Sequence, residues 1–233
     1  MRSNFIKIKE QYNKFGKGSV RLTQSSLFLL QDIKPTQAAY TFPVLENETA
    51  TLDAHEIRLN MNDEFIATGL GLYLVAKAVK KTEGGDVPLA GLFLMTYPNL
   101  EQVADAGKSQ PIYDGSIKIA VNNIVYVEKW DTRKHRFTPR TQWASQILAG
   151  GAVTQSPATI PSNDFAKDAM YPVQPMVTFS GAKKNEVTLI LPEAADGFTW
   201  LTTTNAGETI EYTVAKIGLM LRGYNGQNAA KFQ

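Results

Sequence analysis

The chain has 233 residues, a formal net charge of only +2, 43% apolar residues and no cysteine. Such a chain can bury one sizeable hydrophobic core, and its composition lies far from that of disordered proteins. Disulfides, iron–sulfur clusters and cysteine-ligated zinc are excluded because each needs cysteine. The sequence has neither the apolar run of a signal peptide nor the roughly 18 apolar residues of a membrane-spanning helix, so we expect a soluble protein that is not secreted.

The N-terminal segment is strongly basic. A single acid, Glu10, stands among basic residues that are interleaved with aromatic and aliphatic ones. The basic residues are Arg2, Lys7, Lys9, Lys14, Lys17 and Arg21. Because the segment lacks the periodicity of a core element, we predict that residues 1–35 form an assembly arm. Besides plain solvation, its charges could contact phosphates, stack with unpaired bases through the neighbouring rings, or dock on an adjacent subunit.

The balance of charge reverses between residues 46 and 64. This acidic stretch contains Glu46, Glu48, Asp53, Glu56, Asp63 and Glu64. Opposite charges in separate blocks of one chain can be spread over solvated faces, or they can steer copies of the chain into contact. Both interpretations are kept.

Most of the remaining chain has the pattern of β-strands. Short runs rich in β-branched and aromatic residues are separated by glycine, proline and asparagine. We predict strands at residues 56–62, 89–97, 116–130, 176–180, 187–191 and 209–221, with one or two more within 25–33 and 39–44. Residues 116–130 are expected to form a hairpin that turns at Asn122-Asn123. Residues 65–79 fit two strands, or one long strand bent near Gly69 and Gly71.

About ten strands at such intervals favour a β-sandwich or barrel. A turn at residues 181–185 is expected to join two of them. Residues 132–172 interrupt the pattern, and the only regular element that we expect there is a short helix between 141 and 148. A long segment with little regular structure usually carries function or covers a neighbouring surface. We therefore divide the chain into an arm at 1–35 and a β-sandwich body at 36–233 with a loop-rich excursion at about 132–172.

The excursion opens with WDTRKHRFTP, which holds His135 and a cluster of cations. The cations are Arg133, Lys134, Arg136 and Arg140. They must meet water, acids or phosphates, because burying an unpaired charge costs several kcal/mol or more. We predict a contact between subunits here, since arginine binds carboxylates bidentately. The candidate partners on a neighbouring copy are Glu46, Glu48, Asp53 and Glu56, and phosphate binding and solvation are the alternatives.

No catalytic, cofactor-binding or metal-binding set is recognisable. The only histidines are His55, which we interpret as a strand-edge residue, and His135, interpreted as a surface base. They lie far apart in unrelated contexts, which disfavours a metal site or an acid–base pair. The chain also lacks a GxSxG elbow, a dinucleotide fingerprint and a phosphate-binding loop. We therefore expect no enzyme activity and no cofactor.

A basic arm, an all-β body, long loops and the missing catalytic set resemble a viral capsid protein of the jelly-roll class. Between roughly residues 41 and 228 the chain is similar in style to structural proteins of tailless, lipid-containing bacteriophages. The similar segments are IRLNMNDEFIAT, TYPNL, IYDGSIKIAVNNIVYVEKWDT, FTPRTQ, VTFSGAKKNEVTLILP and GLMLRGYNGQN. The resemblance implies an antiparallel β-sandwich of jelly-roll type. A compact double jelly roll is the alternative, although residues 172–233 offer too few strands for a full second barrel.

The same resemblance implies a function. It indicates a virion structural protein, namely a major capsid protein that self-assembles into an icosahedral shell in the host cytoplasm. Its partners would be further copies of itself and other virion proteins. The basic arm would contact nucleic acid or an internal membrane non-specifically.

A carbohydrate-binding β-sandwich module is the alternative function. Such a module stacks sugars on exposed aromatic rings, whereas aromatic residues are more often buried in a core. The candidate stacking residues are Trp130, Trp143, Trp200, Tyr97 and Tyr113.

Overall fold

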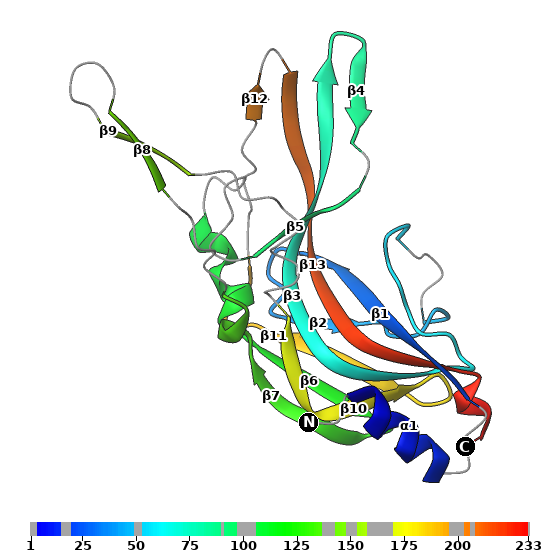
Figure 1. Cartoon of the computed structure of the whole chain (residues 1–233). Helices are drawn as coiled ribbons and strands as arrows, with labels where there is room; N and C mark the ends of the chain where they lie inside the picture. The colour runs from blue at the N-terminus through cyan, green and yellow to red at the C-terminus, as the bar shows by residue number, and fades with distance from the viewer. Residues whose placement is uncertain are drawn as a thin grey trace.

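The computed structural model describes residues 4–14, 20–48, 53–89, 91–96, 106–136, 143–147, 153–157, 170–195, 203–205 and 208–232. Antiparallel strands dominate these residues, and all but two of the strands form two sheets that pack face to face (Figure 1). The expected all-β sandwich is therefore confirmed. None of the helices that the structure describes is long and apolar enough to cross a membrane.

The first sheet is built around two very long strands. Its main strands lie in the spatial order β1 (Arg21–Asp32), β13 (Glu208–Gln227), β3 (Glu64–Thr82) and β10 (Tyr171–Ser180). Of the two alternatives for residues 65–79, the structure has the single long strand. The register between β3 and β13 shifts beside Gly69, between Arg222 and Gly223. A Cβ atom on Gly223 would lie 1.8 Å from the carbonyl oxygen of Ile66, so the two backbones approach too closely there for any larger residue.

The second sheet has four shorter strands. They lie in the order β2 (Ala39–Phe42), β11 (Asn185–Ile190), β6 (Ser116–Val121) and β7 (Ile124–Asp131). The hairpin predicted for residues 116–130 is present as β6 and β7. Its turn residues Asn122 and Asn123 have φ angles of 51° and 64°, the left-handed conformation that asparagine tolerates and that a two-residue hairpin turn requires.

Alternate side chains of both sheets fill the space between them. Strand residues point to opposite faces in turn, so every second apolar residue can enter one core. Large side chains that are fully buried there include Tyr40 and Phe42 from β2, Phe65 and Leu72 from β3, and Phe179 from β10.

The turn predicted at residues 181–185 joins β10 and β11, and these strands belong to different sheets. The Asn185 amide nitrogen donates to the carbonyl oxygens of Ser180 and Lys183, both at 2.9 Å. Its amide oxygen accepts the Ser180 N–H at 3.2 Å. A Cβ atom on Gly181 would lie 2.3 Å from the backbone oxygen of Asn60, so glycine is required where the chain passes from one sheet to the other.

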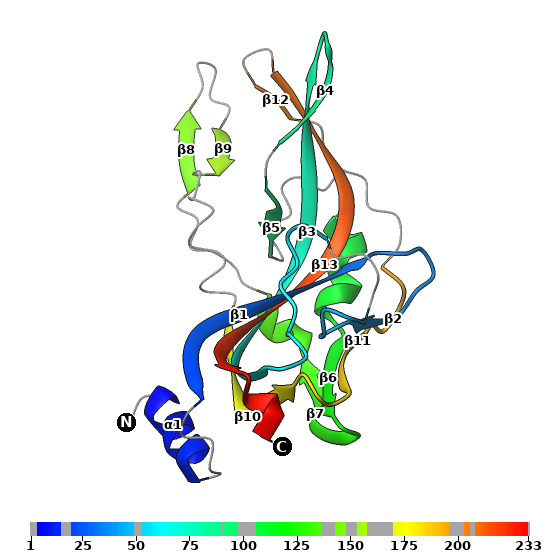
Figure 2. The same ribbon diagram turned by 90° about the vertical axis from the view of Figure 1, so that its right-hand side faces the viewer.

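The ends of β3 and β13 continue beyond the sandwich as a narrow ribbon (Figure 1). Short strands β4 (Gly85–Pro88), β5 (Phe93–Met95) and β12 (Thr203–Asn205) pair with them. Figure 2 shows that this ribbon and a separate hairpin both project away from the end of the molecule that carries the N-terminal helix. The hairpin consists of β8 (Trp143–Ile147) and β9 (Val153–Pro157).

The short helix expected between residues 141 and 148 is wrong, because this segment contains β8. A helix of so few residues gains little from its own hydrogen bonds, whereas β8 pairs along its whole length with β9. The predicted strand at 56–62 is also wrong. Only Ile57 and Leu59 form bridges there, to Phe28 and Leu45, and these two partners lie in different parts of the chain. Of the strand predicted at 89–97, the described residues form only β5.

The assembly arm does not extend through residues 1–35. Residues 21–32 form β1, which pairs with β13 along its whole length and buries Leu27 and Leu29 in the core. Before it, helix α1 (Asn4–Lys14) lies against the sandwich (Figure 1). Ile8 and Tyr12, one helical turn apart, are buried in a cluster with Ile66 and Ala229. Among the helix side chains that the structure describes, only these two are buried, so the apolar face is too narrow to predict a helix from the sequence.

Three short 3-10 helices complete the described elements. They are η1 (Ala106–Tyr113), η2 (Thr132–His135) and η3 (Ala229–Phe232).

Candidate functional site

The segment WDTRKHR leaves the second sheet as a tight turn. Strand β7 ends at Asp131, whose carboxylate accepts the backbone N–H of Arg133 at 2.9 Å and so caps η2. Thr132 is fully buried, and its backbone N–H and hydroxyl both donate to the Gly115 carbonyl oxygen, at 3.1 and 3.0 Å. These bonds hold the turn against the chain that precedes β6.

Each cation of this turn that the structure describes has a partner within the chain. The Arg133 guanidinium binds the Asp131 carboxylate through Nε and Nη2, with distances of 2.7 to 3.0 Å. Arg136 forms an ion pair with Asp114, and the Lys134 ammonium lies 4.4 Å from the ring centroid of Trp130. Arg140 lies outside the described residues. The physical requirement for partners is thus met without a second subunit, and the subunit contact stays a prediction.

His135 is fully buried, so its interpretation as a surface base is wrong. The 3-10 turn folds its ring back under the loop, where the Trp130 indole N–H donates to His135 Nε2 at 2.9 Å. Because Nε2 accepts this bond, it carries no proton and the imidazole is neutral. The edge of the ring also meets Tyr171, with the ring centroids 5.3 Å apart. His135 therefore joins β7 to the start of β10.

The ion pair between Asp131 and Arg133 has a measurable effect on the pKa of Asp131. Hydrogen bonds from the Arg133 side chain, and then from its backbone N–H, lower the pKa of Asp131 to about 2. A carboxyl whose pKa is lower in the folded state stabilises the fold above the unfolded pKa of about 3.9, and this contribution is lost as the pH falls through about 2. In Arg133→Gln we expect the pKa of Asp131 to return towards the ordinary aspartate value. Carbon-13 NMR of the side-chain carboxyl measures it.

Arg136→Gln is the control for this titration, because Arg136 pairs with Asp114 rather than with Asp131. The control should leave the Asp131 value unchanged. If the pKa of Asp131 stayed unchanged in Arg133→Gln, Arg133 would not be the cause of the lowered value. We expect the loss of this ion pair to change the free energy of unfolding little, because both side chains are exposed and solvent screens their charges.

The acidic stretch also has partners within the chain. Glu48 accepts the backbone N–H groups of Val44 and Leu45, at 2.6 and 3.2 Å. Glu46 accepts a bond from the Asn60 amide at 3.1 Å. These hydrogen bonds join parts of the same loop to one another. Farther along, Asp63 accepts the Asn228 N–H at 2.8 Å, which attaches the loop to the C-terminal end of β13.

Asp53 connects this loop to two strands of the first sheet and, through Lys216, to a third. Its carboxylate lies 3.2 Å from the ammonium groups of both Lys77 on β3 and Lys216 on β13. Lys216 also contacts Asp32, its register partner on β1, at 3.0 Å. Burial by itself would raise the pKa of Asp53, but bonds from the His55 backbone N–H, Lys77 and Lys216 hold it well below its usual range. His55 is an exposed turn residue here rather than a strand-edge residue.

Glu56 and Arg58 form a buried ion pair, with 2.7 Å between Glu56 Oε2 and Arg58 Nη2. Glu56 also accepts the backbone N–H groups of Leu30 at 2.9 Å and Asp53 at 3.2 Å. The carboxylate thereby covers the outer edge of β1. Glu56 is only 8% exposed, which leaves little of it for the expected contact with a neighbouring subunit.

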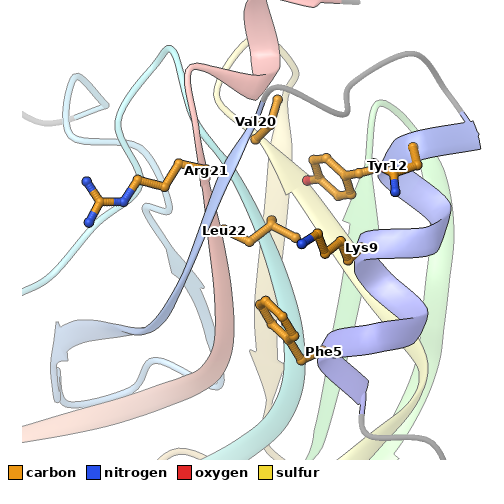
Figure 3. A pocket seen from close by; sticks show the side chains of 7 residues that line it. Phe5, Lys9, Tyr12, Val20, Arg21 and Leu22 are labelled. Carbon is orange, nitrogen blue, oxygen red and sulfur yellow. The ribbon is translucent and has the colours of Figure 1, made fainter.

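The described basic residues of the N-terminal segment do not gather at one place. Lys7 and Lys9 are about 200° apart around α1, given 100° per residue. Arg2 and Lys17 lie outside the described residues, and the structure places Lys14 on the last turn of the helix without describing its side chain. A hollow of about 230 Å³ separates α1 from β1. In Figure 3, Lys9 reaches across this hollow to Leu22, whereas Arg21 points away from it.

The lining of this α1–β1 hollow is mainly apolar. It consists of Phe5, Lys9, Tyr12, Asn13, Val20, Arg21 and Leu22. At its floor the Tyr12 hydroxyl donates to the buried Glu64 carboxylate at 2.8 Å. Burial, together with this bond, raises the pKa of Tyr12 well above its usual range. The tyrosine is therefore a neutral donor at every ordinary pH.

Of the aromatic residues proposed as sugar-stacking platforms, the two whose side chains the structure describes are not free. Tyr113 is fully buried, and its hydroxyl donates to the Met95 carbonyl oxygen at 3.1 Å. Trp130 packs against the core and is partly covered by Lys134. Tyr97 and Trp200 lie outside the described residues, and nothing is described of the Trp143 side chain.

Within the described part of the chain, no group of three His, Asp or Glu side chains is placed to hold a metal ion. Comparisons with protein-family models, with curated proteins and with solved structures find no match for this chain.

Proposed function

We propose that this chain is a virion structural protein, a major capsid protein that assembles into an icosahedral shell. The observation that carries the proposal is the pairing of the eight main strands. Numbered in chain order, these strands are β1, β2, β3, β6, β7, β10, β11 and β13. The first pairs with the eighth, the second with the seventh, the third with the sixth and the fourth with the fifth, all antiparallel.

This nested pairing is the arrangement expected when one long hairpin of four strand pairs is rolled into two sheets. The remaining neighbours are the eighth strand beside the third and the seventh beside the fourth. Together they support a jelly roll, the architecture of viral capsid domains and also of lectins and cupins. Eight strands complete one roll, so we favour the single form over the double one.

Several surface features favour a shell protein over the other jelly-roll functions. The β3–β13 ribbon projects beyond the sandwich and offers contact area outside the core (Figure 1). The start of β7 exposes three successive apolar residues, which is the kind of surface that protein contacts cover. By contrast, Tyr113, a candidate stacking residue of the sugar-binding alternative, is buried in the core. We therefore propose that the partners are copies of this chain and other virion proteins, with α1 available for non-specific contact with nucleic acid or an internal membrane.

The mass of the purified full chain tests this proposal. We expect light scattering to show closed particles of many subunits, in equilibrium with small oligomers and dependent on salt. A chain that stays monomeric over a wide range of concentration and ionic strength would contradict it. Titration of that monomer against a glycan panel would then test the sugar-binding alternative.

A further inference from the structure

The tip of the β6–β7 hairpin exposes an unusual apolar cluster. Ile124, Val125 and Tyr126 follow one another and are 60%, 41% and 40% exposed. The value for Ile124 is the highest among the large apolar side chains that the structure describes. Glu128 lies just beyond this hairpin tip and is exposed, and no basic side chain in the described ranges forms an ion pair with it. The hairpin tip is therefore an apolar projection with the exposed carboxylate of Glu128 beside it.

The α1–β1 hollow is also mainly apolar and is lined by a residue of opposite charge, Lys9. Its volume of about 230 Å³ is below the roughly 300–1,000 Å³ of pockets that bind small molecules. One or two apolar side chains would fill it. Lys9 lines the hollow and extends from α1 towards Leu22 (Figure 3), and no acidic side chain that the structure describes forms an ion pair with it. The α1–β1 hollow is therefore an apolar depression with a free positive charge beside it.

We infer that the hairpin tip of one copy inserts into the α1–β1 hollow of a second copy, with Glu128 of the first facing Lys9 of the second. The contact removes exposed apolar surface from water on both sides, which favours association. The facing charges add complementarity and fix the orientation. This inference rests on the proposed self-assembly and names the surfaces that would carry it.

The two surfaces cannot meet within one copy. Figure 2 shows α1 and the β6–β7 hairpin on opposite sides of the sandwich. Each copy therefore offers its hairpin tip to one neighbour and its hollow to another. Such a head-to-tail contact builds rings when the rotation closes. The N-terminal helix would then act as one wall of a subunit contact rather than as a free arm.

Disulfide trapping tests the contact directly, because the chain contains no cysteine of its own. The two test variants are Ile124→Cys at the hairpin tip and Asn13→Cys at the hollow, both at exposed positions. When equal amounts are mixed and oxidised, the mixed dimer should be the main product, since a disulfide requires Cα atoms within about 7 Å. Ile190→Cys, 45% exposed on β11 of the same sheet, replaces Ile124→Cys in the control mixture and should leave mostly uncrosslinked chain.

A charge exchange provides the second readout. Lys9→Glu alone and Glu128→Lys alone should each reduce the yield of assembled material, and the double variant should restore it. Both positions are exposed, so neither change is expected to alter the melting temperature. Failure of the double variant to recover assembly would overturn the inferred pairing of these charges.

The outcomes also separate this contact from the proposed function. Particles that form without the mixed dimer would overturn the contact and leave the shell proposal standing. A mixed dimer in material that never exceeds small oligomers would support the contact and contradict the shell. A dominant dimer of Ile124→Cys with itself would also overturn the contact, because it would mean that two hairpin tips meet each other.

Discussion

Glu56→Ala should lower the free energy of unfolding by about 3–5 kcal/mol, the usual cost of removing one member of a buried ion pair. The change leaves Arg58 without this carboxylate, and the Leu30 N–H loses its acceptor. In a chain of this size the melting temperature should fall by about 6–20 °C. Urea denaturation followed by circular dichroism measures the effect.

Glu46→Ala is the matched control, because it removes an acid of the same stretch that is exposed and accepts one bond from Asn60. We expect a change within about 0.5 kcal/mol. If Glu56→Ala left stability unchanged but abolished assembly, Glu56 would be a subunit contact, as the sequence alone suggests, rather than a structural acid.

Deleting residues 1–35 should abolish cooperative folding. The deletion removes β1, and with it the pairing along one side of β13 and the buried side chains of Leu27 and Leu29. Losing these two buried leucines alone costs several kcal/mol, which is comparable to the whole stability of a typical domain. Circular dichroism and a thermal melt of the truncated chain measure this directly.

Deleting residues 1–18 is the comparison that isolates α1. This shorter deletion keeps β1 and should give a folded sandwich of reduced stability, because Ile8 and Tyr12 no longer cover Ile66 and the Glu64 carboxylate loses its tyrosine donor. A cooperative melt after the longer deletion would show that β1 is dispensable and that the whole segment is an arm.

The sequence is informative where structure is decided locally. The hairpin turn at Asn122-Asn123 depends on two residues that accept positive φ angles, and the flanking alternation places the strands. The apolar runs of β3 and β13 are also visible, because a central strand is covered on both faces. Alternation in EIRLNMN places Glu56 and Arg58 on one side of the chain, a signal for their ion pair that can be read from spacing.

Long-range pairing explains the failures. Residues 143–147 become a strand only because β9 lies beside them, and nothing within the segment itself specifies that partner. His135 is buried because Trp130 and Tyr171 close around it. The nested order of the eight strands depends on contacts such as β1 with β13, which join opposite ends of the chain. A local sequence pattern does not show which distant segment a strand pairs with.

Electron cryo-microscopy of the purified full chain tests the central claim most directly. The proposal predicts closed shells of uniform diameter in which the density of each subunit fits this two-sheet sandwich. Uniform single subunits, or only irregular aggregates, under every condition that keeps the chain folded would contradict it.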